Sequence, residues 1–422
     1  PPPTDPVARR THASPARAFA RRWRLQRRRR RMQRLGGLLG GLRDLVGERL
    51  AGGPALLWQV NDRRVVEERP ISEGGFAFVV QVRDVETGEV FALKKIICQE
   101  NEAVATAIRE AEILDALPEH KNIVGYYGHA MIDRGVNGCP HRQVFILLEL
   151  CTGGTLLDML DHYSGVLPED EMFKALTDVA EAIFCLHSHS PPLQHRDLKL
   201  ENVLRGSDGF WKVVDFGSWG DQMYDLSEVP TKDISKLHEE VTRNTTFMYR
   251  PPEMVDLYLR YPISCAVDIW MLGCILYALL YNRHPFQDAA TLAIREARYW
   301  LPERSPPPSP KVVDLLVWLL APDPRHRPSS RKLVTTLWQW QDLPSLELPA
   351  PVFEHRAALV AIWQPGTPGG GGRGIRGGRG SAGGGGGSTA ASKAVARGGR
   401  GGGYAGGRLP VESGAARQAR AE

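Results

Sequence analysis

The spacing of apolar residues changes character along the chain. In the first half, short strand-like runs alternate with turn residues, and they fall at residues 65–66, 76–85, 90–97 and 145–148. From Asp170 onward, apolar residues recur mainly at helical spacing. Strands followed by helices predict an α+β fold with two unequal lobes, a small β-rich N-lobe and a larger α-helical C-lobe.

Composition divides the chain into a central domain and two tails. We predict a domain over residues 65–341, with an N-lobe at about 65–148 and a C-lobe at about 152–341. Outside it we expect a disordered Arg-rich arm, a linker and a disordered Pro/Gly-rich tail with Arg-Gly-Gly repeats, at residues 1–34, 35–64 and 342–422. The chain opens on Pro1 and not on Met, so we expect a fragment whose true start is missing.

The net charge of +5 conceals a separation of charge along the chain. Residues 1–34 carry 12 Arg against one acidic residue, and residues 365–422 carry nine basic and two acidic residues. This leaves a net charge of −13 on residues 35–364. The predicted domain is therefore acidic and both tails are basic.

Two classes of protein are disfavoured by the sequence. The six Cys residues show neither C-x-x-C spacing nor a His pattern suited to zinc, so we expect small buried thiols in a reduced intracellular protein. No run of about 18 apolar residues is present, and we therefore expect no transmembrane segment.

One run in the helical half carries the strongest chemical signal. It reads His195-Arg196-Asp197-Leu198-Lys199-Leu200-Glu201-Asn202, and Asp215-Phe216-Gly217 follows it. An Asp-Phe-Gly turn alone occurs by chance in many proteins, but the two together in this order are typical of a phosphoryl-transfer site. There Asp197 would orient and deprotonate a hydroxyl, Lys199 would lie against the phosphoryl group, and Asn202 and Asp215 would hold magnesium.

A glycine-containing loop follows the first predicted strand. Its exposed backbone N–H groups would cover the phosphates of ATP. Taken alone, the loop is better explained as an ordinary hairpin turn, because Ser72 and Ala77 replace the outer two of three expected glycines. The candidate nucleotide contacts in this segment are Ser72, Glu73, Gly74, Gly75, Phe76, Ala77 and Val79.

Lys94 follows Phe91-Ala92-Leu93 in the predicted strand 90–97 and is the candidate for binding the α- and β-phosphates. Alternation along a strand points the adjacent Lys95 to the opposite face. Glu110, sixteen residues further on in a helical segment, is the predicted ion-pair partner of Lys94. Glu112 is the competing carboxylate, but it faces away from Glu110 on a helix.

The apolar run at 145–148 leads into the adenine side of the predicted nucleotide pocket. Leu148 would border the adenine ring, and the backbone of the next three residues would hydrogen-bond its edge. The candidate residues on this side of the pocket are Ala92, Leu148, Glu149, Leu150 and Cys151.

Four further residues are expected to support catalysis. Glu253 is predicted to form a buried ion pair with Arg327, and two unrelated surface charges are the alternative. Asp268 would brace residues 195–202, called the catalytic loop below. Thr246, seven residues before Glu253, is expected to place its hydroxyl beside Asp197 and Lys199.

With these residues in place, residues 65–341 resemble a eukaryotic protein kinase of the serine/threonine type, the type being indicated by Lys199 and Thr246. The chain is also similar to the Numb-associated kinase family, which includes the adaptor-associated and cyclin-G-associated kinases, in segments 73–77, 215–218, 244–250 and 252–258. The resemblance implies the bilobal protein kinase fold, ATP and Mg²⁺ as cofactors, and an extra helix within residues 254–266.

The resemblance also implies substrates and partners. It implies phosphorylation of Ser or Thr on protein substrates, in several members the medium chain of clathrin adaptors, with roles in endocytosis and cortical actin. It therefore places the chain in the cytoplasm, at endocytic membranes or at the cell cortex, with the clathrin adaptor complex as a partner. Neither tail contains the Asn-Pro-Phe or Asp-Pro-Phe motifs that often recruit family members to adaptors.

Two alternatives remain open at the level of sequence. One is a pseudokinase scaffold without turnover. The other is an RNA-associated protein acting through the Arg-Gly-Gly tail, with RNA or an anionic membrane surface bound by the basic segments, although GC-rich codon bias also explains their composition. For regulation, Arg196 could receive a phosphate from a candidate site at Thr231, Ser235, Thr242 or Thr245.

Overall fold

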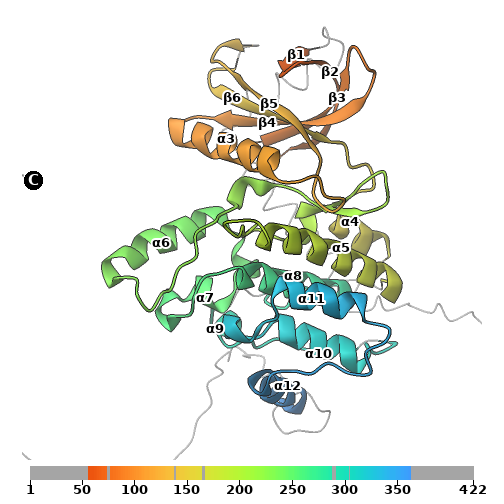
Figure 1. Cartoon of the computed structure of the whole chain (residues 1–422), viewed down its shortest axis with the longest axis vertical. Coiled ribbons are helices and arrows are strands. Elements are labelled where there is room, and N and C mark those ends of the chain that lie inside the picture. The colour runs from red at the N-terminus through yellow and green to blue at the C-terminus, as the bar shows by residue number, and fades with distance from the viewer. Residues whose placement is uncertain are drawn as a thin grey trace, which may run out of the picture. The chain divides into compact units, whose positions relative to one another are not determined.

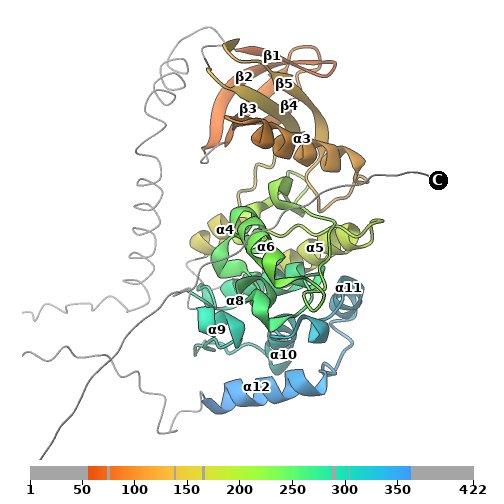
Figure 2. The same ribbon diagram turned by 90° about the vertical axis from the view of Figure 1, so that its left-hand side faces the viewer.

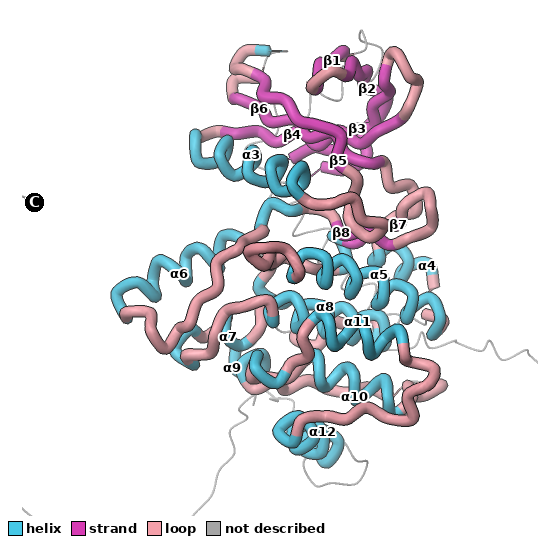
Figure 3. The backbone as a smooth tube through the Cα atoms, viewed as in Figure 1, coloured by secondary structure: helices cyan, strands magenta, loops and turns pink. Residues whose placement is uncertain are grey.

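A computed structural model describes residues 56–73, 77–136, 139–163, 167–287, 291–303 and 305–362. They form a β-rich lobe followed in sequence and in space by a larger helical lobe, as Figures 1 and 3 show. The predicted α+β, two-lobed fold is confirmed. No helix in these ranges is long and apolar enough to span a bilayer.

The N-lobe is built on one antiparallel sheet of six strands in the order β1-β2-β3-β4-β6-β5. Helix α3 (Asn101–Ala116) crosses one face of this sheet (Figure 1). Sequential strands therefore pair as hairpins, except where α3 and β5 separate β4 from β6. The strands are β1 (Leu57–Val60), β2 (Arg63–Glu73), β3 (Ala77–Asp84), β4 (Val90–Cys98), β5 (Tyr126–Ile132) and β6 (Arg142–Glu149).

The two faces of this sheet bury different sets of side chains. Phe91 and Phe145 belong to a small cluster closed by Trp58, whose ring meets Phe145 edge-on at 4.8 Å. Ala92 and Ile146, one position along in the same strands, belong instead to the main core that includes α3. Both faces are covered, which explains why the apolar run of β6 is continuous rather than alternating.

The C-lobe surrounds one helix that is buried over nearly its whole length. This is α8 (Ala266–Tyr281), in which every residue from Val267 to Leu280 is buried. Apart from Asp268, this helix is apolar on all sides, and such a helix needs neighbours on every side. The other C-lobe elements are α4 (Leu156–His162), α5 (Glu169–His187), β7 (Val203–Arg205), β8 (Trp211–Val213), α6 (Thr231–Asn244), α7 (Pro252–Val255), α9 (Thr291–Arg295), α10 (Pro310–Leu319), α11 (Ser330–Trp338) and α12 (Ala350–Ile362).

Two ordered elements lie outside the predicted domain 65–341. Strand β1 lies inside the predicted linker 35–64, and it is ordered because Trp58 and Val60 alternate into the core. Helix α12 lies inside the predicted tail 342–422, at the end of the helical lobe away from the sheet (Figures 1 and 2). It buries Val352 and Leu359, and its Pro351 is tolerated in the first turn of a helix. The Arg-rich arm and the Arg-Gly-Gly repeats lie outside the described residues.

The extra helix expected just after Glu253 is also absent from the fully described segment 254–266. Helix α7 ends at Val255, and only a 3₁₀ turn at Leu257–Leu259 follows. Arg260 then adopts a left-handed conformation with φ 58°, which ends the turn. A helix of 14 residues, α6, lies instead on the N-terminal side of Glu253.

Candidate active site

The catalytic loop is held in place by a buried carboxylate of α8. Asp268 accepts hydrogen bonds from the backbone N–H of His195 at 2.8 Å and of Arg196 at 2.9 Å. The ring of His187 adds a third contact at 3.0 Å. Burial alone would raise the pKa of Asp268, but these hydrogen bonds and nearby imidazoles lower it, so the carboxylate stays charged. Arg196 has a φ of 66°, a conformation that this bracing maintains immediately before Asp197.

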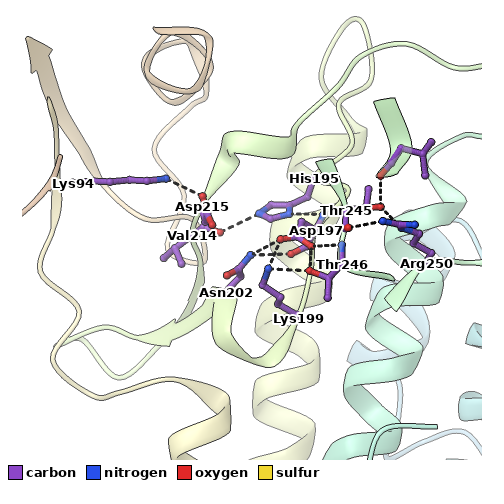
Figure 4. Close-up of polar contacts among 11 residues, drawn as sticks. Lys94, His195, Asp197, Lys199, Asn202, Val214, Asp215, Thr245, Thr246 and Arg250 are labelled. Atoms are coloured by element: carbon purple, nitrogen blue, oxygen red, sulfur yellow. Dashed lines mark hydrogen bonds and ion pairs between the residues drawn. The ribbon is translucent and has the colours of Figure 1, made fainter. Parts of the chain in front are cut away.

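Asp197, Lys199 and Thr246 meet at one point (Figure 4). The Thr246 hydroxyl lies 2.6 Å from Asp197 Oδ1, and its backbone N–H donates to the same oxygen at 3.0 Å. Lys199 Nζ donates to the Thr246 hydroxyl at 3.1 Å and also to Asp197 Oδ2. A threonine hydroxyl is thus held between a carboxylate that can accept its proton and an ammonium group.

A second charged group joins the two lobes. Lys94 Nζ contacts Glu110 Oε1 at 2.5 Å and Asp215 Oδ1 at 2.8 Å. Although burial favours the neutral amine, the two carboxylates raise the pKa of Lys94, so it remains a cation. The charge of Lys94 in turn lowers the pKa of Asp215 to about 2. Lys95 lies on the opposite face with Glu67, as alternation predicts.

Asn202 and Asp215 have the donor chemistry that magnesium requires. Asn202 donates from Nδ2 to the backbone carbonyl of Asp197 at 2.9 Å, which leaves its amide oxygen as a ligand atom. Asp215 is ionised at neutral pH and its side chain is 47% exposed. Magnesium in nucleotide sites takes few protein oxygens and completes its shell with phosphates and water. The two residues fit such an ion.

The strands of the N-lobe bring the remaining nucleotide candidates into register. Ser72 pairs with Val79, which pairs with Lys94 on β4, and two positions earlier Ala92 pairs with Leu148. Ser72, Glu73, Ala77 and Val79 therefore surround the loop that precedes β3. Gly74, Gly75 and Phe76 lie outside the described residues, and their covering of the phosphates stays a prediction.

The segment after β6 carries the adenine candidates. Leu148 and Ala92 are buried, whereas Leu150 and Cys151 are partly exposed. The backbone N–H of Glu149 donates to the Gly125 carbonyl at 2.8 Å. Its carboxylate lies 3.3 Å from Lys212 Nζ. Glu149 is therefore tied to the protein through its N–H and side chain, and the carbonyl of Glu149 and the N–H of Cys151 remain the groups expected to meet adenine.

Glu253 and Arg327 form the predicted ion pair. Arg327 Nη1 and Nη2 contact the two carboxylate oxygens at 2.6 and 2.9 Å, and both side chains are 0% exposed. The alternative of two surface charges is wrong. The pair joins the C-terminal end of the segment that carries Thr246 to the helical core.

Trp219 was not among the residues predicted from sequence. It follows the Asp-Phe-Gly turn, and its indole N–H donates to the backbone carbonyl of Arg109 at 3.1 Å. The Arg109 guanidinium lies 4.7 Å above the indole ring. Because Arg109 precedes Glu110, this contact fastens the turn to α3 beside the Lys94 ion pair. A tryptophan directly after the turn is the signal that could have indicated it.

A cavity of about 820 Å³ lies next to the catalytic residues but is separate from the nucleotide candidates of β3 and β6. Its walls come from α3, from residues 217–222 and from the C-terminal half of α6. Arg196 and Glu240 reach it from two of these elements. Glu110, the ion-pair partner of Lys94, is among the residues that line the cavity.

The chain is similar in sequence to known protein kinases. A family model described as protein kinase domain matches residues 65–339. A probable serine/threonine-protein kinase of Dictyostelium discoideum is 33% identical over 274 residues, which are 64% of this chain and 24% of that protein. The serine/threonine-protein kinase ppk30 of Schizosaccharomyces pombe is 34% identical over 298 residues, 69% of this chain and 30% of that protein.

A relative with a named cellular role is also found. The actin-regulating kinase PRK1 of Saccharomyces cerevisiae is 32% identical over 281 residues, 65% of this chain and 34% of that protein. This chain therefore spans about a quarter to a third of the length of these relatives.

Proposed function

This chain belongs to the protein kinase family, and from that premise we propose that it transfers the γ-phosphoryl group of ATP to Ser and Thr hydroxyls of protein substrates. The observation that carries the proposal is the contact of Asp197 and Lys199 with the Thr246 hydroxyl. A substrate hydroxyl placed there would have a proton acceptor on one side and a cation on the other.

The proposed mechanism assigns one role to each group. Asp197 orients the acceptor hydroxyl and accepts its proton, while Lys199 stabilises negative charge on the phosphoryl group as it moves. Lys94, held by Glu110 at 2.5 Å, would bind the nucleotide phosphates. Magnesium held by Asn202 and Asp215 would offset the charge of the phosphates.

The same geometry argues against the pseudokinase alternative. A scaffold without turnover has no need for a cation held between two carboxylates, or for an acidic residue with a pKa of about 2 at the expected metal position. The described residues supply both, and they supply the Asp197 proton acceptor as well. RNA binding through the Arg-Gly-Gly tail falls on residues outside the described ranges and stays a prediction.

We also propose a narrower substrate class within this activity, the medium chains of clathrin adaptors. The support is the similarity of segments 73–77, 215–218 and 252–258 to the Numb-associated kinases, together with a yeast relative named for the regulation of actin. This proposal places the chain in the cytoplasm, at endocytic membranes or at the cell cortex.

A transfer assay with two substrates tests both levels of the proposal. The purified chain is given Mg-ATP with either an adaptor medium-chain fragment or a generic basic protein, and phosphothreonine and phosphoserine are measured. Transfer to both supports the two proposals. Transfer to the basic protein alone supports the kinase and contradicts the adaptor substrate. Transfer to neither, with ATP still bound, contradicts the enzyme and supports a pseudokinase.

A further inference from the structure

The guanidinium of Arg196 lies in a closed set of contacts made by the protein itself. Its Nη1 donates to Glu240 Oε1 at 3.0 Å, its Nη2 to the Gln222 carbonyl at 2.9 Å, and its Nε to Gln194 Oε1 at 3.4 Å. The Arg196 side chain is only 8% exposed. Each side-chain nitrogen of Arg196 therefore has an acceptor, and one of these acceptors is an anion.

Glu240 reaches Arg196 because α6 is docked by its apolar face. Ile234, Leu237 and Val241 are the buried residues of this helix, and they recur at helical spacing. Glu240 is the neighbour of Val241, so its carboxylate lies at the edge of the buried face, 40% exposed. Its second oxygen lies 3.3 Å from the Tyr224 hydroxyl, whose shorter contact, at 2.6 Å, is with Gln222 Oε1. The Arg196 guanidinium is therefore the main partner of the Glu240 carboxylate.

The backbone of Gly220 packs directly against the guanidinium of Arg196. A Cβ added to Gly220 would lie 2.4 Å from Arg196 Cζ and 2.6 Å from Nη1, closer than real contacts allow. Gly220 and Gln194 also exchange two backbone hydrogen bonds, at 2.8 and 3.0 Å. The segment after Asp215 therefore packs flat against Arg196, which leaves the Glu240 side as the direction from which an anion approaches.

The four phosphorylation sites predicted from sequence are less well placed than Glu240 to contact the Arg196 guanidinium. The Thr245 hydroxyl donates to the Val241 carbonyl at 2.6 Å and accepts from Arg250 Nε at 2.6 Å, so it is engaged on both sides. Ser235 and Thr242 lie on the exposed face of α6, and Thr231 begins that helix. Within the described part of the chain, the Arg196 side chain hydrogen-bonds to Gln194, Gln222 and Glu240 and to none of these four residues.

We propose that Glu240 is a positioning residue that supplies the negative charge required at Arg196, so that the catalytic loop is ordered without phosphorylation of residues 218–246. This rests on the proposed kinase activity. Arg196 adjoins Asp197 and has a left-handed backbone, so the orientation of its side chain is transmitted directly to the catalytic carboxylate. Phosphate groups and carboxylates satisfy the same guanidinium chemistry.

The proposal has a kinetic consequence that a merely structural role would not produce. Glu240 acts through Asp197, which orients the acceptor, and not through Lys94, which binds ATP. Its loss should therefore lower kcat and leave the KM for ATP nearly unchanged. Misplacement of a reacting group by about 1 Å can lower a rate by about 100-fold, so we expect a fall in kcat of about 10- to 100-fold.

The experiment begins with the full chain freed of phosphate by a phosphatase, which mass spectrometry confirms. The phosphate-free enzyme is expected to retain the kcat of the untreated enzyme. Glu240→Gln, which keeps the shape and removes the charge, is expected to show the loss of kcat. Glu239→Gln is the matched control, because Glu239 is the preceding residue of α6 and is exposed. It should match the wild type.

A double-mutant cycle separates coupling to Arg196 from a general effect on folding. If Glu240 acts through Arg196, Glu240→Gln should have no further effect on kcat in an Arg196→Ala background. Additive losses would overturn the proposal, as would an inactive phosphate-free wild type that recovers on phosphorylation. A wild type inactive in both states would instead contradict the proposed kinase function. Thermal melts of all variants identify any that fail to fold. In that case the kcat of Glu240→Asp, which retains the charge, provides the decisive comparison with the wild type.

Discussion

The Glu253–Arg327 pair allows a stability prediction whose size follows from the structure. Both side chains are 0% exposed, and the two contacts measure 2.6 and 2.9 Å. Glu253→Gln would remove the negative charge and leave the Arg327 cation buried. Removing one partner of a buried ion pair costs about 3–5 kcal/mol.

Other acceptors place the expected cost at the lower end of that range. Arg327 also donates to the carbonyls of Ala321 at 2.8 Å and Ala266 at 3.0 Å, which would still solvate part of its charge. We therefore expect a loss of about 3 kcal/mol in the free energy of unfolding. For a domain of this size, about 2–4 °C per kcal/mol gives a fall in Tm of roughly 6–12 °C.

Thermal and urea unfolding of the nucleotide-free chain measure this loss. The matched control is Arg325→Ala, because Arg325 pairs with Asp323 at 2.7 Å but its side chain is 64% exposed. An exposed pair contributes about 0–1 kcal/mol, so this variant should melt close to the wild type. Replacing both partners, as in Glu253→Leu with Arg327→Met, should cost less than Glu253→Gln alone. A Glu253→Gln protein that melts within 2 °C of the wild type would refute the reasoning.

Three further predictions concern the ion pair between the lobes. Glu110→Gln should lower kcat/KM for ATP by about 10- to 100-fold, because the phosphate-binding lysine loses its partner, while Glu112→Gln on the exposed face should leave it unchanged. Trp219→Phe removes the hydrogen bond to the Arg109 carbonyl and should lower kcat/KM for ATP several-fold, an effect that should vanish in the Glu110→Gln background. The pKa of Asp215 is lowered from 3.8 to about 2, so its contribution to stability is present above about pH 4 and is lost as the pH falls toward 2. Urea unfolding across this pH range should show a smaller loss in the free energy of unfolding for Asp215→Asn than for the wild type. Equal losses in the two proteins would contradict the assignment.

The sequence allowed the two-lobed fold and the positions of the catalytic groups to be predicted because both depend on short-range order. Asp197, Lys199 and Asn202 lie in one loop, so their spacing alone places them together. Lys94 and Glu110 required one more assumption, that a helix follows β4 and faces back toward it. Alternation on the strand and the burial of Glu110 but not Glu112 bear that assumption out.

Features that depend on tertiary docking could not be predicted in the same way. Strand β1 follows a stretch that is dense in Gly and Pro. Its four residues form a strand because the Trp58 ring packs against the ring of Phe145. The amphipathic pattern of α6 was present in the sequence, but the extra helix was expected after Glu253 on the basis of resemblance alone. The contact between Arg196 and Glu240 joins residues 44 positions apart and appears only once α6 is docked.

The most direct test of phosphoryl transfer compares the wild-type chain with Asp197→Asn. Both proteins are incubated with Mg-ATP labelled at the γ-phosphate and a protein substrate containing Ser and Thr, and ATP binding is measured in parallel. We expect the variant to bind ATP like the wild type while its rate of transfer falls by about 10²- to 10⁴-fold. Equal rates of transfer by the two proteins would contradict the role of Asp197 and with it the assignment of this site.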